Sequence, residues 1–219
     1  MIYIIMIAVM VASAIVQSVL NRRFEKYSKV RIGMTGAEVA ERMLMAHGIH
    51  DVSVSCIPGT LTDHYDPTKK QLNLSEAVYR MPSVAAAAVA AHECGHAVQH
   101  ATGYAPLRLR SALVPFVNFA SKWVSWALLL GILLIQITSA PLWIAIILFG
   151  ASTLFSLVTL PVEINASRRA VVWLSDAGIT TYETKPMAQD ALKWAAYTYV
   201  IAALGSLATL LYYIGIARD

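Results

Sequence analysis

Residues 84–99 of this 219-residue chain read VAAAAVAAHECGHAVQ, a run without proline that Pro82 precedes. Its alanine content and the preceding proline predict a helix. Residues four apart on a helix share one face, so His92 and His96 point the same way. Two imidazoles one turn apart are spaced to bind one Zn²⁺, and Glu93 can serve as general base for a water on that metal. The stretch therefore predicts a catalytic metal site.

A surface helix that happens to carry two histidines and a glutamate is the alternative interpretation. The flanking segments Val84–Ala91 and Ala97–Val98 are apolar, which favours burial of this helix. A buried carboxylate beside two imidazoles needs a partner, because an unpaired buried charge is costly. A metal ion supplies that partner; zinc is the expected ion, and another divalent metal is the alternative.

The composition is that of a membrane protein. Hydrophobic residues make up 58% of the chain and charged residues 14%, whereas about a quarter of a soluble domain is charged. The net charge is +4, but no basic helix or patch of interleaved aromatic residues indicates nucleic-acid binding. We therefore expect a mainly α membrane protein that contains one small polar domain.

Four apolar segments are long enough to cross a bilayer as helices. They are residues 1–20, 117–137, 142–160 and 195–217. Eleven Lys and Arg residues lie in 21–112 and four in 161–194, so the positive-inside rule places both segments in the cytoplasm. The expected location is a prokaryotic inner or plasma membrane, with the active site on the cytoplasmic side.

The polar segment 21–112 has the pattern of a small α+β domain. It is predicted to hold one amphipathic helix, three short strands and the metal-binding helix; these are residues 33–50, 52–57, 61–65, 71–75 and 84–101. A short sheet would then pack on the metal-binding helix. We expect Gln71–Ser75 to be an exposed edge strand that binds a polypeptide substrate through main-chain hydrogen bonds; an ordinary core strand is the alternative.

A catalytic zinc needs a third protein ligand. His100 shares a face with His92, but eight residues of helix separate the two by about 12 Å along the axis. The metzincin pattern has its third histidine ten residues after the first, but that position in this chain is Thr102, so the pattern is excluded. His64 is better suited to contact the substrate or a transition-state oxyanion, a role that Tyr65 can also fill.

Glu163 is the favoured third ligand. It follows the third apolar segment directly, on the helical segment 161–194, and an ionisable residue at a membrane boundary indicates a functional site. A glutamate solvated by headgroups, or paired with Arg168 or Arg169, is the alternative. The two arginines are expected to anchor the interface or to contact an oxyanion. Ser167, one turn later, is placed to hydrogen-bond a ligand imidazole.

Several stretches resemble the YugP-like family of membrane-bound neutral zinc metallopeptidases. They are Leu61–Pro67 (LTDHYDP), Leu74–Ser75, Ala90–Ala97 (AAHECGHA) and Pro161–Ala170 (PVEINASRRA). The resemblance implies a zincin-like domain, with His92 and His96 as zinc ligands and Glu93 as the base. A more distant likeness to HtpX-type gluzincins implies Glu163 as third ligand; Ser167 stands where that family has Asp.

The sequence thus predicts a membrane-embedded zinc endopeptidase that hydrolyses unfolded or membrane-proximal polypeptides. A catalytically inactive zinc-binding protein that assists assembly is the first alternative, although it would not need Glu93. A metal transporter is disfavoured, because such a protein would carry histidines within its membrane spans. All six histidines of this chain lie outside the predicted spans.

Overall fold

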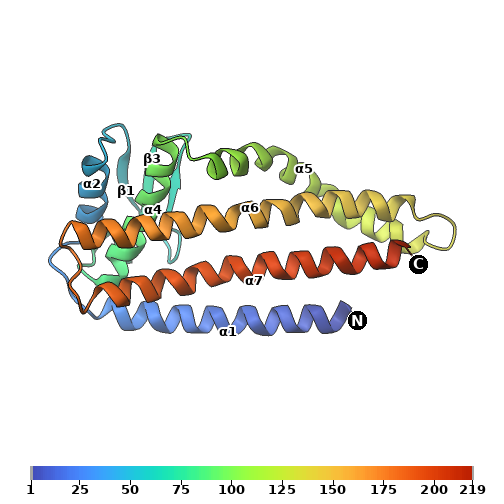
Figure 1. Cartoon of the computed structure of the whole chain (residues 1–219), viewed down its shortest axis with the longest axis horizontal. Coiled ribbons are helices and arrows are strands. Elements are labelled where there is room, and N and C mark those ends of the chain that lie inside the picture. Colours follow the sequence, from blue (N-terminus) through green and yellow to red (C-terminus); the bar gives the residue numbers. More distant parts are fainter. Residues whose placement is uncertain (1, 219) are drawn as a thin grey trace. The chain divides into compact units, whose positions relative to one another are not determined.

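The computed structural model describes residues 2–218 and is mainly helical, with one small sheet (Figure 1). The long helices are α1 (Ile2–Ser28), α4 (Val84–Ala101), α5 (Ala105–Leu133), α6 (Ala140–Asp176) and α7 (Lys185–Arg218). The shorter elements are α2 (Gly36–Ala46), α3 (Glu76–Arg80), β1 (Ser53–Ile57), β2 (His64–Asp66) and β3 (Gln71–Ser75).

The chain forms two compact units. The apolar unit comprises the chain as far as residue 15, residues 105–161, and the chain from residue 198 onward. The polar unit comprises Val16–Tyr104 and Val162–Tyr197. Helices α1, α5, α6 and α7 are each long and apolar enough to cross a membrane, which agrees with the four spans predicted from sequence.

Close helix contacts and large exposed apolar side chains characterise the apolar unit. A Cβ on Gly131 of α5 would lie 2.7 Å from the Cα of Leu142 in α6, so the two backbones approach closely there. The hydroxyls of Thr153 in α6 and Ser206 in α7 lie 2.7 Å apart. Trp126 is 63% exposed. Small residues and hydroxyl contacts between helices, with apolar surface outside, are typical of membrane helices.

All four of these helices extend beyond the predicted spans, and α7 begins at Lys185 rather than at 195. Helix α1 runs eight residues past residue 20 as far as Ser28, and α5 begins at Ala105 rather than at 117 and ends at Leu133 rather than at 137. Helix α6 passes through Pro161 without ending. Hydropathy marks the apolar part of a helix, whereas charged residues such as Arg and Lys also favour helix and continue it.

The sheet corrects one prediction about the substrate strand. Its order is β1-β3-β2, with β1 parallel and β2 antiparallel to β3. Gln71–Ser75 is therefore the central strand, and the prediction that it forms an exposed edge was wrong. Alternation alone does not distinguish edge from centre, because that depends on which strands pair. The edges belong to β1 and β2, and β2 is a three-residue strand rather than the predicted 61–65.

Helix α2 starts with a capping box, as the Thr35–Glu38 spacing of the sequence would produce. The Thr35 hydroxyl accepts from the Glu38 amide, and the Glu38 carboxylate accepts from the Thr35 amide at 2.7 Å. These two bonds satisfy amides that the first helical turn leaves without a partner. The cap fixes where α2 begins.

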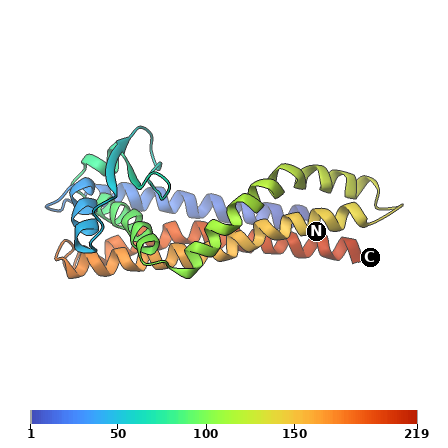
Figure 2. The same ribbon diagram turned by 90° about the horizontal axis from the view of Figure 1, so that it is seen from above.

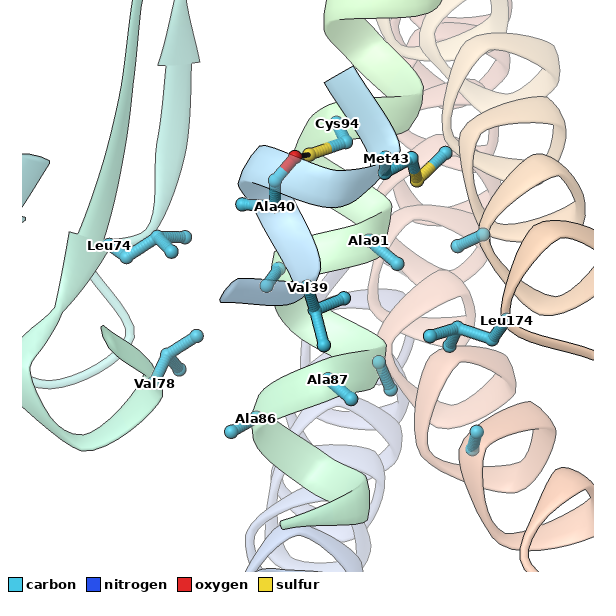
Figure 3. Close-up of a cluster of buried hydrophobic side chains, with 14 of the residues drawn as sticks. Val39, Ala40, Met43, Leu74, Val78, Ala86, Ala87, Ala91, Cys94 and Leu174 are labelled. Atoms are coloured by element: carbon cyan, nitrogen blue, oxygen red, sulfur yellow. Dashed lines mark hydrogen bonds between the residues drawn. The ribbon is translucent and has the colours of Figure 1, made fainter. Parts of the chain in front are cut away.

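The core of the polar unit surrounds α4. Figure 3 shows Val39, Ala40 and Met43 of α2 facing the alanines of α4, with Leu174 of α6 on another side of that helix. Strands β2 and β3 also contact α4, so the sheet packs on this helix as predicted (Figure 2). The small alanine side chains let neighbouring elements approach from several directions. Helix α4 is therefore the buried axis of this unit.

Two methionines on α2 test this packing. Met43 is fully buried and Met45, two residues later, is 61% exposed. Met43→Ala should lower the free energy of unfolding by about 2–5 kcal/mol, because it removes buried methylenes and leaves a cavity. Met45→Ala should change it by less than about 0.5 kcal/mol. Thermal unfolding of both variants in detergent measures the difference; equal effects would contradict the burial of Met43.

Candidate metal centre

Helix α4 presents two imidazoles on one face. The Ser83 hydroxyl caps its start by accepting from the Ala86 amide at 3.2 Å. His92 and His96 lie four positions apart on this regular helix, and their ring centroids are 4.8 Å apart with the rings nearly perpendicular. Both side chains are largely buried, at 14% and 12% exposure. The Nε2 atoms of both imidazoles point toward the same carboxylate oxygen, Glu163 Oε2.

Glu163 of α6 completes the group. Its Oε2 atom lies 3.3 Å from His92 Nε2 and 3.6 Å from His96 Nε2. Among residues 2–218, these three form the one group of three or more possible ligands whose atoms all lie within 4.8 Å of one another. Ligand bonds of about 2.0–2.2 Å in a tetrahedral zinc site place donor atoms about 3.4 Å apart. The spacing and the donor types therefore fit Zn²⁺.

The absence of a side chain at Gly95 permits this arrangement. A Cβ on Gly95 would lie 2.8 Å from the carbonyl oxygen of Ala166 and 3.1 Å from its Cα. The backbones of α4 and α6 are thus in contact at Gly95, which lies between the two histidines in the sequence, and at Ala166, three residues after Glu163. Such a close approach is possible only without a side chain at this position. The glycine of the HECGH stretch consequently brings Glu163 within reach of both imidazoles.

Burial sets the electrostatics of the site. Burial raises the pKa of Glu93, an effect that the nearby His92 and His96 oppose and that Glu163 and Asp63 reinforce. Burial opposes protonation of His96, but the carboxylates of Glu163 and Glu93 outweigh it and raise the pKa of His96. With both imidazoles neutral and both carboxylates ionised, which are the forms that bind a metal, these four groups would carry two negative charges. One divalent cation would balance them in this buried setting.

Each candidate ligand imidazole also has a hydrogen-bond partner on its outer nitrogen. The hydroxyl of Ser167, on α6, lies 3.1 Å from His92 Nδ1. The side-chain oxygen of Gln99, on α4, lies 3.0 Å from His96 Nδ1. Both contacts leave Nε2 directed at Glu163. Partners of this kind orient metal-binding histidines and maintain their tautomer.

The remaining histidines singled out from sequence have other contacts. His64 Nδ1 lies 2.7 Å from the Thr62 carbonyl oxygen, and His64 Nε2 lies 3.1 Å from the Asn73 side-chain nitrogen. His64 is thereby held against β3, and its role with an oxyanion stays a prediction. Tyr65 Oη lies 3.0 Å from His100 Nδ1, so these two residues pair with each other.

Sequence reasoning assigned no role to three residues that shape the site. They are Asp63, Gly95 and Gln99. The Asp63 carboxylate accepts a hydrogen bond from the backbone amide of Ser75 at 2.7 Å. This bond connects the residue directly before β2 to the last residue of β3. Gln99 follows His96 by three residues, a helical spacing at which side chains meet. That spacing was a usable signal, whereas the Asp63 and Gly95 contacts depend on distant parts of the chain.

These observations define an integral membrane protein with a candidate metal centre of two histidines and a glutamate. Residues 2–218 match the family model described as "Putative neutral zinc metallopeptidase", and the chain belongs to that family. It is 47% identical over 193 residues to the "Putative membrane protease YugP" of Bacillus subtilis, covering 87% of this chain and 85% of that protein. No solved structure matches the chain.

The contact at Gly95 yields a specific prediction. Gly95→Ala should weaken zinc binding about tenfold or more, because the added methyl group separates Glu163 from the imidazoles. Gly150→Ala is the matched control, since a Cβ on that helical glycine of α6 meets nothing within 4 Å. Competition with a chromophoric chelator measures both affinities. Unchanged affinity in Gly95→Ala would show that the close contact is not needed.

Proposed function

We propose that this protein is a zinc-dependent membrane endopeptidase whose metal ligands are His92, His96 and Glu163. The observation that carries the proposal is the convergence of these donors, spaced for a tetrahedral ion, beside the buried Glu93. A protein that only bound zinc would need the ligands but no further buried carboxylate. Membership of a family of neutral zinc metallopeptidases supports the same conclusion.

Glu93 has the chemistry of a general base. A bound Zn²⁺ supplies polarisation of the scissile carbonyl and acidifies water. Glu93 accepts the proton of the attacking water and later donates it to the leaving amine. Its raised pKa suits both steps, because a carboxyl group with a higher pKa retains a proton more readily. His64 or Tyr65 would hydrogen-bond the oxyanion once the substrate is bound.

The substrate we infer is an unfolded or membrane-proximal polypeptide, bound along the free edge of β2. We propose β2 in place of β3, the strand expected from sequence, because both sides of β3 are already paired with other strands. Strand β2 contacts α4, and Asp63, directly before it, acts on the charge of Glu93. An extended peptide would pair with β2 through main-chain hydrogen bonds, with few side-chain requirements.

The proposal places the active site on the cytoplasmic side of a prokaryotic inner or plasma membrane. Its support is the excess of Lys and Arg in segments 21–112 and 161–194, which hold fifteen of the seventeen (eleven plus four). Such clusters remain in the cytoplasm when the neighbouring helices insert. Accessibility of an introduced surface cysteine at Ser53 to a membrane-impermeant thiol reagent tests this; labelling in intact cells would contradict it.

Two substitutions test the catalytic assignment. Glu93→Gln should bind zinc near one ion per chain but cleave casein about 10²–10⁴-fold more slowly, because the proton acceptor is lost. Glu163→Ala should lose both zinc and activity. Glu76→Gln is the control, since that carboxylate is 69% exposed and pairs only on the surface with Arg80. Metal analysis and peptide release on the purified full chain provide the measurements.

The outcomes of this experiment separate the candidate functions. Zinc binding without any cleavage beyond the level of Glu93→Gln would favour the non-enzymatic zinc protein. If Glu163→Ala kept its full metal content and activity, Glu163 would not be the third ligand. His64 would then be the first residue to examine as the third ligand. If the protein bound another divalent ion in preference to zinc, the proposed metal would change but the proposed hydrolytic mechanism would not.

Binding at the edge of β2 predicts sensitivity to the peptide backbone. A substrate peptide methylated on the amide nitrogens next to the scissile bond should bind about tenfold more weakly, since each lost main-chain hydrogen bond costs about 1 kcal/mol. The same peptide with altered side chains at those positions is the control. The inhibition constants of the two peptides, measured against casein cleavage, give the comparison. Equal inhibition constants for the methylated peptide and the control peptide would contradict strand pairing.

A further inference from the structure

Gln99 is a fully buried amide at the junction of α4 and α6. Its Nε2 donates to the Val162 carbonyl oxygen at 2.8 Å and to Asn165 Oδ1 at 3.0 Å. Its Oε1 lies 3.0 Å from His96 Nδ1. The two amide hydrogens and the amide oxygen therefore all have partners, one of which is a candidate metal ligand.

These partners determine which way the Gln99 amide points. The Val162 carbonyl can only accept a hydrogen bond, so the nitrogen of Gln99 must face it. Asn165 Oδ1 also acts as an acceptor, because it receives the Nε hydrogen of Arg169 at 2.8 Å and a guanidinium can only donate. Both contacts turn the Gln99 nitrogen toward α6. The Gln99 oxygen is consequently the atom that faces His96.

The orientation of Gln99 in turn determines the tautomer of His96. Because the Gln99 oxygen only accepts, His96 Nδ1 must carry the hydrogen. The other ring nitrogen, Nε2, faces Glu163 and offers its lone pair when the imidazole is neutral. The Ser167 hydroxyl on His92 Nδ1 can either donate or accept, so it does not choose a tautomer in this way.

We propose that Gln99, oriented by Val162 and Asn165, is a positioning residue that keeps His96 in the Nδ1-protonated tautomer and so makes Nε2 available to the metal. The inference rests on the proposed function, since it assumes that His96 is a metal ligand. Helix α6 thereby contributes twice to the centre: Glu163 as a ligand, and Val162 and Asn165 through Gln99. A role for Gln99 as a mere clamp between the helices makes different predictions.

Two substitutions of Gln99 separate positioning from clamping. Gln99→Glu keeps an acceptor for His96 but loses both donors to α6, whereas Gln99→Leu loses all three contacts. Positioning predicts zinc affinity within about threefold of wild type for Gln99→Glu and a loss of about 10–100-fold for Gln99→Leu. Cys94→Ala, a buried neighbour on α4 whose thiol contacts Ala40 instead, should keep wild-type affinity. Chelator competition on the full chain measures all four proteins.

The tautomer itself is measured on the wild-type protein, independently of how the variants fold. In metal-free protein carrying ¹⁵N-histidine, at a pH at which the His96 ring is neutral, that ring should show a hydrogen on Nδ1. A hydrogen on Nε2 would overturn the proposal, as would equal affinities in Gln99→Leu and wild type or equal losses in Gln99→Leu and Gln99→Glu. Failure of the wild-type chain to bind zinc would instead refute the proposed function.

Discussion

The contact between the backbones of α4 and α6 at Gly95 and Ala166 is the constraint on which the site depends. Two histidines one helical turn apart define only one side of a coordination sphere. The third donor, Glu163, must arrive from another helix, at a distance set by how closely the two backbones approach. A side chain at position 95 would separate the helices, and the imidazoles and carboxylate would then no longer share one ion.

Several polar groups are buried near this contact in an otherwise apolar environment. Glu93, Gln99 and Glu163 are all buried, around an alanine-rich helix. Each has a chemical reason to be there: the two carboxylates would balance a divalent cation at the candidate centre, and the amide satisfies a carbonyl and an imidazole. Buried polar groups of this kind are costly when partly satisfied and specific when fully satisfied. The site is accordingly built from groups that stabilise one another only when all are in place.

Helix α6 runs from one of the apolar segments directly into the candidate metal centre. Glu163 lies two residues after Pro161, on the same helix α6 whose preceding residues form one of the apolar segments. Helix α7 likewise starts within the polar unit and ends in the apolar one.

Much of this protein could be predicted from sequence alone, because the signals involved are local. Hydropathy identified the four apolar helices, and the HECGH spacing put two imidazoles on one face of a helix. Membership of the metallopeptidase family agreed with that interpretation. Other features were decided by tertiary structure. The central position of Gln71–Ser75 depends on strand pairing, and the contacts of Gln99, Asp63 and Gly95 depend on segments distant in sequence. Periodicity reports which face of an element is apolar, but only packing determines which element that face meets.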